Sequence, residues 1–338
     1  MAIRTLLVGA GGRGADWVRA VAAAPGFELS GCVDVDPAAL ERAASLGGVA
    51  ADRCWARLDV ALAHGEFDAA IVSTPADDHL PACEQALTHG LGVLVEKPFT
   101  LALADARELV RLADLKRRPL MVAQNYRHLR VFRAARGVIA SGAIGRVLAA
   151  HWHYYRVPHA MAASLARLPH TVLWGMGIHH LDVLRTLIGG PVDSVSADLF
   201  SARPHPALDG ASMNVSLRFA SGARATYTAS YESSGHEYFE GGQEFFGRVV
   251  GEHGTLHILH RWLVLCAEGR LPRVVGRGRR AVKEERLLLD QFADAMATGD
   301  AKDMSGRDNL ETMAIAEACV RSAAERRWID LRELSHDA

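Results

Sequence analysis

In the first 123 residues, short apolar runs alternate with stretches in which apolar residues recur every three or four positions. Continuous apolar runs predict strands buried on both faces, and the three-and-four spacing predicts helices. The expected strands are 3–8, 28–33, 68–73, 92–95 and 119–123. The expected helices are 15–23, 37–46, 57–64, 78–89 and 102–115, with Asp36 and Pro37 opening the second of them. This alternation predicts an α/β fold with a doubly wound parallel sheet.

The pattern changes near Gln124, which divides the chain into two expected domains, 1–123 and 124–338. Helices are expected at 129–141, 173–188, 284–298 and 306–327, and a strand at 146–155. Between about 192 and 275 polar and apolar residues alternate, and segments 213–231 and 251–266 each predict two strands around a turn. We expect a second α/β domain with a large, mostly antiparallel, open-faced sheet, and C-terminal helices that pack back on the first domain. An open sheet face favours pairing of subunits, so a homodimer or homotetramer is expected.

Composition narrows the class of protein. With 338 residues the chain exceeds one ordinary core, and 49% hydrophobic and 23% charged residues are typical of a globular protein. A net charge of −1 does not indicate binding to nucleic acid or to an anionic membrane surface. The basic segment 270–283 is interpreted as a solvated loop. The apolar run 3–8 is too short for a signal peptide or a membrane span. Five scattered cysteines without a CxxC pair predict reduced thiols and a cytoplasmic protein: Cys32, Cys54, Cys83, Cys266 and Cys319.

A glycine-rich turn follows the first expected strand, and its sequence is Gly9-Ala10-Gly11-Gly12-Arg13-Gly14. Asp34 stands 20 positions beyond Gly14, at the end of the second strand. In the Rossmann fold such glycines permit a tight turn, a close approach to pyrophosphate and close packing of the helix, while the acidic residue binds the ribose hydroxyls. NAD is therefore expected, and NADP less so, because the charge of Asp34 repels a 2′-phosphate. Arg13 leaves a second option, since a guanidinium can stack on adenine or pair with an extra phosphate. A glycine turn without a ligand is the alternative.

Lys97, in the segment Glu96-Lys97-Pro98, directly follows the strand 92–95, where ligands of open α/β sheets bind. Burial and a neighbouring nicotinamide cation both lower the pKa of a lysine, which suits it to exchange a proton with a hydroxyl group. Pro98 is expected to fix this backbone, with a cis bond as one option. The alternative is a surface lysine in a loop.

His179 and Asp182 are three residues apart on an expected helix, so Asp182 can orient the His179 ring toward a substrate. His180 is interpreted as a buried core residue. The many histidines (His151, His153, His159, His170, His179 and His180) show neither HExxH nor a cysteine partner, so no metal is expected.

Other polar segments end the neighbouring strands. Gln124-Asn125-Tyr126-Arg127 follows the strand 119–123 and suits a nicotinamide amide and hydroxyl-rich ligands. Ser73-Thr74-Pro75 ends the strand 68–73, and His79 either lines the same site or merely starts a helix. The stretch 151–170 carries Trp152, Tyr154, Tyr155, Arg156 and His159, interpreted either as a wall facing a sugar or as core.

Six segments follow one another along the chain: GAGGRG, VDVDP, STP with His79, LVEKP, QNYRHLRVFRAARGVIASGAIGRV and GIHHLDVLRTLIG. In this order they resemble the Gfo/Idh/MocA oxidoreductase family, and the resemblance covers nearly the whole chain. The resemblance implies Lys97 as the catalytic lysine, His179 as the active-site histidine, and Pro98 as a cis-proline. The expected cofactor-binding residues are Gly9, Gly11, Gly12, Arg13, Gly14, Asp34, Ser73, Thr74, Pro75, His79, Glu96, Lys97 and Gln124. The expected substrate-binding residues are Lys97, Asn125, Tyr126, Arg127, Tyr155, Arg156, Trp174, His179 and Asp182.

The implied activity is an NAD-dependent dehydrogenase or reductase acting on a secondary hydroxyl, or ketone, of a sugar, cyclitol or glycoside. Two alternatives stay open: a glycosidase or eliminase that recycles its NAD, and an NAD-binding regulator without activity. The chain departs from the family at Gly175, where many relatives carry an aspartate four residues before the histidine. This departure opens room for a bulkier substrate.

Overall fold

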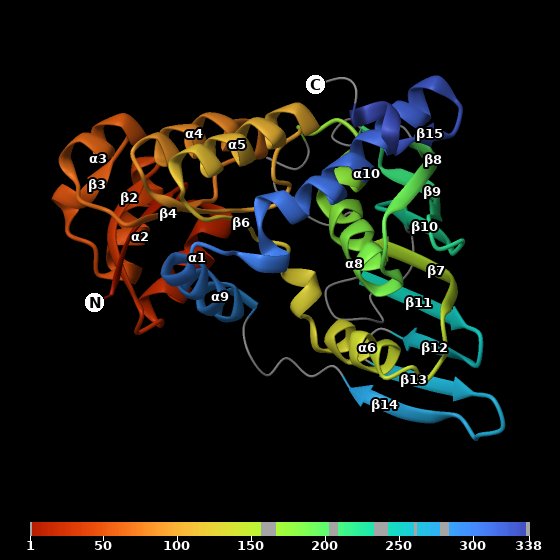
Figure 1. Ribbon diagram of the computed structural model, residues 1–338. Helices are drawn as coiled ribbons and strands as arrows, with labels where there is room; N and C mark the ends of the chain where they lie inside the picture. Colours follow the sequence, from red (N-terminus) through yellow and green to blue (C-terminus); the bar gives the residue numbers. More distant parts are fainter. Residues whose placement is uncertain are drawn as a thin grey trace. The chain divides into compact units, whose positions relative to one another are not determined.

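The computed structural model describes residues 2–156, 167–202, 209–232, 243–259, 262–277 and 284–335 (Figure 1). They form two compact units, each described by itself below. One unit combines Met1–Asn125 with Val282–Met313, and the other combines Tyr126–Ala281 with Ala314–Ala338. Among the described helices, none has the length and apolar character needed to cross a membrane.

The first unit is built on a six-stranded parallel sheet with the strand order β3-β2-β1-β4-β5-β6. Its strands are β1 (Ile3–Val8), β2 (Phe27–Val33), β3 (Cys54–Trp55), β4 (Ala69–Val72), β5 (Gly92–Val95) and β6 (Leu120–Val122). The order reverses between β1 and β4, so the connections leave these two strands toward opposite faces. In open α/β sheets, ligands bind beyond the carboxyl ends of the strands at such a reversal. The predicted doubly wound parallel sheet is confirmed.

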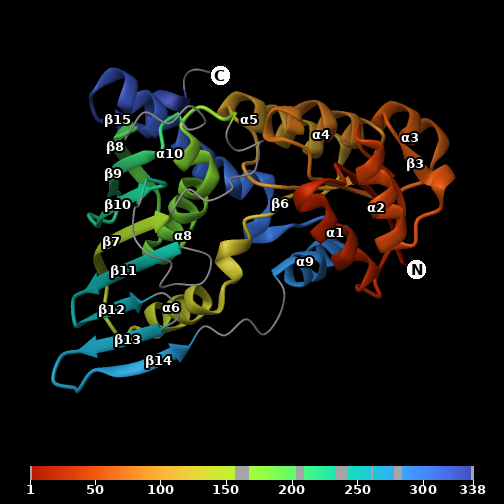
Figure 2. The same ribbon diagram turned by 180° about the vertical axis from the view of Figure 1, so that it is seen from behind.

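Six helices cover this sheet on its two faces: α1 (Gly12–Ala22), α2 (Pro37–Gly47), α3 (Leu58–His64), α4 (His79–Thr88), α5 (Leu103–Lys116) and α9 (Glu284–Thr298). Figures 1 and 2 show α1, α2 and α9 on one face and α3, α4 and α5 on the other. On the first face, Trp17 of α1 and Phe292 of α9 are fully buried in one apolar core with Ile71 of the sheet. α9 therefore belongs to the first unit by packing, although 159 residues separate Glu284 from Asn125.

Two helix starts matter for the site. The cap of α2 is as predicted, since the Asp36 carboxylate accepts a hydrogen bond from the Ala38 N–H and Pro37 is the first helical residue. The start of α1 was predicted at residue 15 but lies at Gly12, inside the glycine turn. Arg13 is thus part of the first helical turn.

The second unit is built on a nine-stranded sheet ordered β14-β13-β12-β11-β7-β10-β9-β8-β15. Its strands are β7 (Val147–Arg156), β8 (Val192–Phe200), β9 (Ser212–Phe219), β10 (Arg224–Ser230), β11 (Gln243–Gly251), β12 (Gly254–Leu259), β13 (Trp262–Ala267), β14 (Arg273–Arg277) and β15 (Ile329–Asp330). All neighbours are antiparallel except β7 and β10. The two predicted strand pairs are confirmed as β9–β10 and β12–β13.

Helices α6 (Arg130–Ala140) and α8 (Ile178–Ile188), with the end of α10 (Gly306–Glu325), lie on one face of this sheet (Figure 1). Side chains along β7 point alternately to the two faces of the sheet: Trp152 and Tyr154 are buried, while His151 is exposed. Residues 173–188 were predicted as one helix; the first five, Leu173–Gly177, form a π-helical turn ahead of α8.

Candidate functional site

The glycine turn lies against the loop that follows β4. Gly9 has φ +90°, and a Cβ there would stand 2.7 Å from the backbone of Ser73 and Thr74. A Cβ on Gly14 would stand 2.1 Å from the Gly9 carbonyl oxygen, so α1 can approach β1 this closely only with glycine at this position. Gly9 therefore permits the tight turn, and Gly14 permits the close packing of helix and strand, that a dinucleotide-binding turn requires.

Asp34, at the end of β2, turns its carboxylate onto the same turn. Its Oδ2 accepts hydrogen bonds from the N–H groups of Ala10 (2.7 Å) and Gly11 (3.0 Å), and Oδ1 accepts one from the Asp36 N–H (2.9 Å). A carboxylate has about four lone-pair positions, so acceptor capacity remains for ribose hydroxyls. The next residue, Val35, is 87% exposed, an apolar side chain beside the position expected for an adenosine. Composition and spacing gave no reason to single out Val35.

Buried polar atoms without a protein hydrogen-bond partner gather at the ends of β4 and β6. Of the buried side-chain polar atoms without such a partner in the part of the chain that the structure describes, four lie at these two strand ends: the hydroxyl oxygens of Ser73 and Thr74 and both amide atoms of Gln124. Gln124 is only 1% exposed. A buried amide with neither water nor protein partner costs about 1–3 kcal/mol, which a ligand amide or phosphate can offset. These residues fit a dinucleotide in both chemistry and placement.

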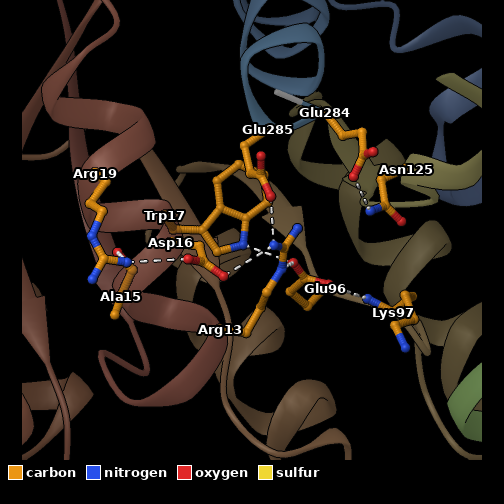
Figure 3. Close-up of polar contacts among 10 residues, drawn as sticks. All are labelled: Arg13, Ala15, Asp16, Trp17, Arg19, Glu96, Lys97, Asn125, Glu284 and Glu285. Atoms are coloured by element: carbon orange, nitrogen blue, oxygen red, sulfur yellow. Dashed lines mark hydrogen bonds and ion pairs between the residues drawn. The ribbon is translucent and has the colours of Figure 1, made fainter. Parts of the chain in front are cut away.

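Lys97 follows β5, and its bond to Pro98 is cis, as the sequence allowed. The preceding carboxylate, Glu96, is buried and accepts hydrogen bonds from Arg13 Nε and Trp17 Nε1, both at 2.8 Å, and from the Lys97 N–H at 3.2 Å (Figure 3). Burial lowers the pKa of Lys97 to about 8; Glu96 opposes this shift and Arg13 adds to it. The lysine can therefore gain and lose a proton near neutral pH.

Arg13 has partners that the sequence did not indicate. Its Nη1 donates to Glu285 Oε1 at 2.6 Å, and its Nε to Glu96, while Asp16 lies at 3.4 Å. Glu285 and the adjacent Glu284, which accepts a hydrogen bond from Asn125 Nδ2 at 3.2 Å, form the first turn of α9. The sequence shows two acids at a helix start, which is typical of any helix, so nothing in it distinguished them as site residues.

His79, the first residue of α4, joins two of these loops. One ring nitrogen lies 2.8 Å from the carbonyl oxygen of Pro98 and the other 3.1 Å from that of Thr74. Burial lowers the pKa of His79 despite these carbonyls, so the ring is neutral at pH 7 and donates to one of them at a time. It fixes the loops after β4 and β5 relative to each other, which makes it more than a helix-start residue.

The remaining predicted residues lie in the second unit. Arg127 donates to both oxygens of Asp182 at 2.5 Å, and both side chains are 1% exposed. The Tyr126 ring stacks on His179, with centroids 4.1 Å apart. The Asp182 carboxylate, which was expected to orient His179, is bound by Arg127, and the His179 ring stacks on Tyr126. A direct contact between Asp182 and His179 stays a prediction. A substrate contact by any of these four stays a prediction.

Trp174 and Gly175 belong to the π-helical turn just before His179, and Trp174 is 4% exposed. Such turns are frequent at functional sites. Tyr155 and Arg156 are half-buried at the end of β7. Their contact with a substrate stays a prediction.

The other histidines divide between core and surface. His180 is confirmed as a core residue: it is 1% exposed, one ring nitrogen lies 2.8 Å from the Tyr227 hydroxyl, and burial lowers its pKa to about 3. His151 is exposed and pairs with Thr226. His159 lies outside the described residues. Within the described ranges, no group of three His, Cys, Asp or Glu side chains is arranged to hold a metal ion.

Comparison with known proteins gives two matches to family models, together spanning most of the chain. Residues 3–124 match the model described as oxidoreductase family, NAD-binding Rossmann fold, and residues 132–257 match the GFO/IDH/MocA C-terminal domain. The chain is 26% identical to D-apiose dehydrogenase of Rhizobium rhizogenes, covering 97% of each chain. It is 29% identical to inositol 2-dehydrogenase of Rhizobium meliloti, covering 98% of this chain and all of that one. A crystal structure of an oxidoreductase from Agrobacterium radiobacter in complex with NAD+, L-tartaric acid and magnesium superposes with a TM-score of 0.88 at 24% identity, over 99% of this chain and 100% of that one.

Proposed function

Since the chain belongs to the Gfo/Idh/MocA family of NAD-binding oxidoreductases, we propose that it is a dehydrogenase or reductase acting on a secondary hydroxyl, or the matching ketone, of a sugar, cyclitol or glycoside. The observation that carries this proposal is Lys97, a lysine of lowered pKa at the carboxyl end of β5, on the sheet edge that also bears the glycine turn. Two relatives support the substrate class, since their names give an apiose and an inositol dehydrogenase.

The residues that would hold NAD are those of the first unit. The N–H groups at the start of α1 would bind the pyrophosphate, Asp34 would bind the ribose hydroxyls, and the buried amide of Gln124 would bind the carboxamide. The charge of Asp34 favours NAD over NADP. When bound, the nicotinamide supplies the hydride acceptor, or the donor in reverse.

Lys97 would handle the hydroxyl proton. In the oxidative direction its neutral amine takes the proton, and in the reductive direction its ammonium returns it. With a pKa of about 8, both forms are populated near neutral pH. The family resemblance adds His179 as the second proton carrier, and Gly175 as extra room beside the substrate.

A substrate panel tests this function. Sugars, cyclitols, aminoglycosides and other glycosides are incubated with NAD⁺ and NADP⁺ in parallel, and the absorbance of the reduced coenzyme is followed. We expect reduction of NAD⁺, and not of NADP⁺, with at least one polyhydroxylated compound. Product without net NADH would indicate an enzyme that recycles its coenzyme. Coenzyme binding without turnover of any compound would indicate a regulator.

We also propose that the chain assembles through the face of the nine-stranded sheet that lies opposite α6 and α8. Leu259 and Trp262 are directly paired across β12 and β13, and each is about two-fifths exposed. Val264 and Val274 pair across β13 and β14. Val264 lies on the same side as Trp262, because Leu263 between these two is buried toward α6. An apolar stripe of this kind is typical of a subunit interface.

Replacing Trp262 with glutamate is expected to convert the oligomer to monomers, because a charge would have to be desolvated at the interface. Light scattering after size-exclusion chromatography measures the mass. Leu115→Glu is the control, since Leu115 is 68% exposed on α5 of the other unit. A monomeric unmodified chain, or a W262E variant with unchanged mass, contradicts this interface.

A further inference from the structure

Four charged side chains of alternating sign lie one after another in space, from the first turn of α9 to Lys97 (Figure 3). They are Glu285, Arg13, Glu96 and Lys97. Ion pairs join Glu285 to Arg13 and Arg13 to Glu96, and Glu96 and Lys97 are neighbours in the chain. The side chains of Glu285 and Glu96 are only 13% and 9% exposed, so water screens these charges weakly.

Glu96 is fixed from three sides. One carboxylate oxygen accepts hydrogen bonds from Arg13 Nε and Trp17 Nε1, both at 2.8 Å, and the other from the Lys97 N–H at 3.2 Å. Trp17 is fully buried in the core, so the indole holds the carboxylate at a set place. A carboxylate this constrained cannot turn away from the lysine that follows it.

Arg13 is in turn fixed by Glu285. The ion pair is 2.6 Å long, whereas Asp16, half-exposed on the same helix as Arg13, lies at 3.4 Å. The packing of α9 positions Glu285, because Leu288, Leu289 and Phe292 of this helix are fully buried in the core of the first unit. Packing of a helix far away in sequence thus sets the position of a charge beside the coenzyme turn.

We propose that Arg13 and Glu285 are positioning residues that act through Glu96 to set the charge of Lys97, an inference that rests on the proposed function of Lys97 as the proton carrier. Arg13 neutralises part of the Glu96 charge and so disfavours the ammonium form. Glu285 neutralises part of the Arg13 charge and so favours it. The two residues therefore act in opposite directions on the same group.

The direction of the pKa shifts agrees with this arrangement. Burial is the main cause that lowers the pKa of Lys97, Glu96 raises it, and Arg13 lowers it again. Three other titratable groups lie around these loops. They are Glu284, which accepts a hydrogen bond from Asn125; Asp16, which lies near Arg13; and His79, which is neutral and lies against the Pro98 carbonyl. They are unchanged in the variants below, apart from the Asp16 control.

The test titrates Lys97 in the coenzyme-free protein, by competitive labelling of amines with acetic anhydride across a pH series and mass spectrometry of the labelled peptide. Exposed Lys116 serves as the internal standard. We expect a midpoint near 8 for the unmodified chain. Arg13→Gln should raise the midpoint by about one pH unit and Glu285→Gln should lower it, by less. Arg13→Lys, which keeps the charge, should restore most of the original midpoint, and Asp16→Asn should leave it unchanged.

Opposite shifts separate this role from a merely structural one, because loss of local structure would move the midpoint in one direction for every variant. Midpoints that do not move, or that move together in R13Q and E285Q, overturn the proposal. Circular dichroism checks that each variant is folded; if R13Q is not, E285Q and R13K decide alone. Shifts as expected in a protein that reduces NAD⁺ with no compound of the panel would leave the charge network standing and refute the dehydrogenase assignment.

Discussion

Replacing Lys97 with methionine should lower kcat by about 10³-fold while leaving NAD⁺ binding nearly unchanged, because methionine keeps the length and apolar stem of lysine but cannot carry a proton. The unmodified enzyme should oxidise its substrate faster as the pH rises through about 8, where Lys97 becomes neutral, and reduce the ketone faster below that pH. NADH absorbance with a substrate from the panel measures turnover, and calorimetric titration measures coenzyme affinity.

Lys116→Met is the matched control, because Lys116 lies exposed in the last turn of α5, where it donates to the Thr88 carbonyl. It should retain full activity. If K97M turned over at a rate close to that of the unmodified chain, Lys97 would not be the proton carrier, and His179 would remain as the proposed base. If K97M lost NAD⁺ affinity as well, its effect on kcat would have to be measured at saturating coenzyme.

Replacing Asp34 with alanine should lower kcat/KM for NAD⁺ by about 100-fold, because two hydrogen bonds from ribose hydroxyls to a charged acceptor are lost. The carboxylate also accepts from the Ala10 and Gly11 N–H groups, so the turn itself should loosen. NADP⁺ no longer meets a negative charge, and the ratio of kcat/KM for NADP⁺ to that for NAD⁺ should therefore rise. Steady-state kinetics with both coenzymes measures this ratio.

Asp36→Ala provides the comparison, two residues along the same loop. Asp36 caps α2 through the Ala38 N–H, so its loss should cost about 1 kcal/mol of stability without changing the coenzyme preference. An unchanged coenzyme ratio in D34A would mean that the ribose lies elsewhere.

The parallel sheet could be predicted because most of its strands are short, mainly apolar runs that are followed by glycine or polar residues. β1, β5 and α9 have the predicted bounds, Ile3–Val8, Gly92–Val95 and Glu284–Thr298. In the second unit β11 was not predicted as a strand of its own, because it gains its regularity only from pairing with β7 and β12. The π-helical turn Leu173–Gly177 leaves no trace in hydrophobic spacing over so few residues.

The residues of the candidate site could be predicted wherever a strand end placed them, as for Asp34, Lys97 and Gln124. Partners brought by tertiary packing could not. Glu285 reaches Arg13 across 272 positions, and Arg127 reaches Asp182 across 55. Helical spacing predicted that Asp182 and His179 share one face, but it could not reveal that a buried guanidinium would bind the carboxylate.

Hydride transfer itself is tested most directly with substrates of the panel that carry deuterium at every carbon. The account predicts that NAD⁺ incubated with such a compound becomes NADH bearing one deuterium at the nicotinamide C4, detected by mass spectrometry, and that K97M yields almost none. Product formed with no deuterium-labelled NADH at any stage would contradict it.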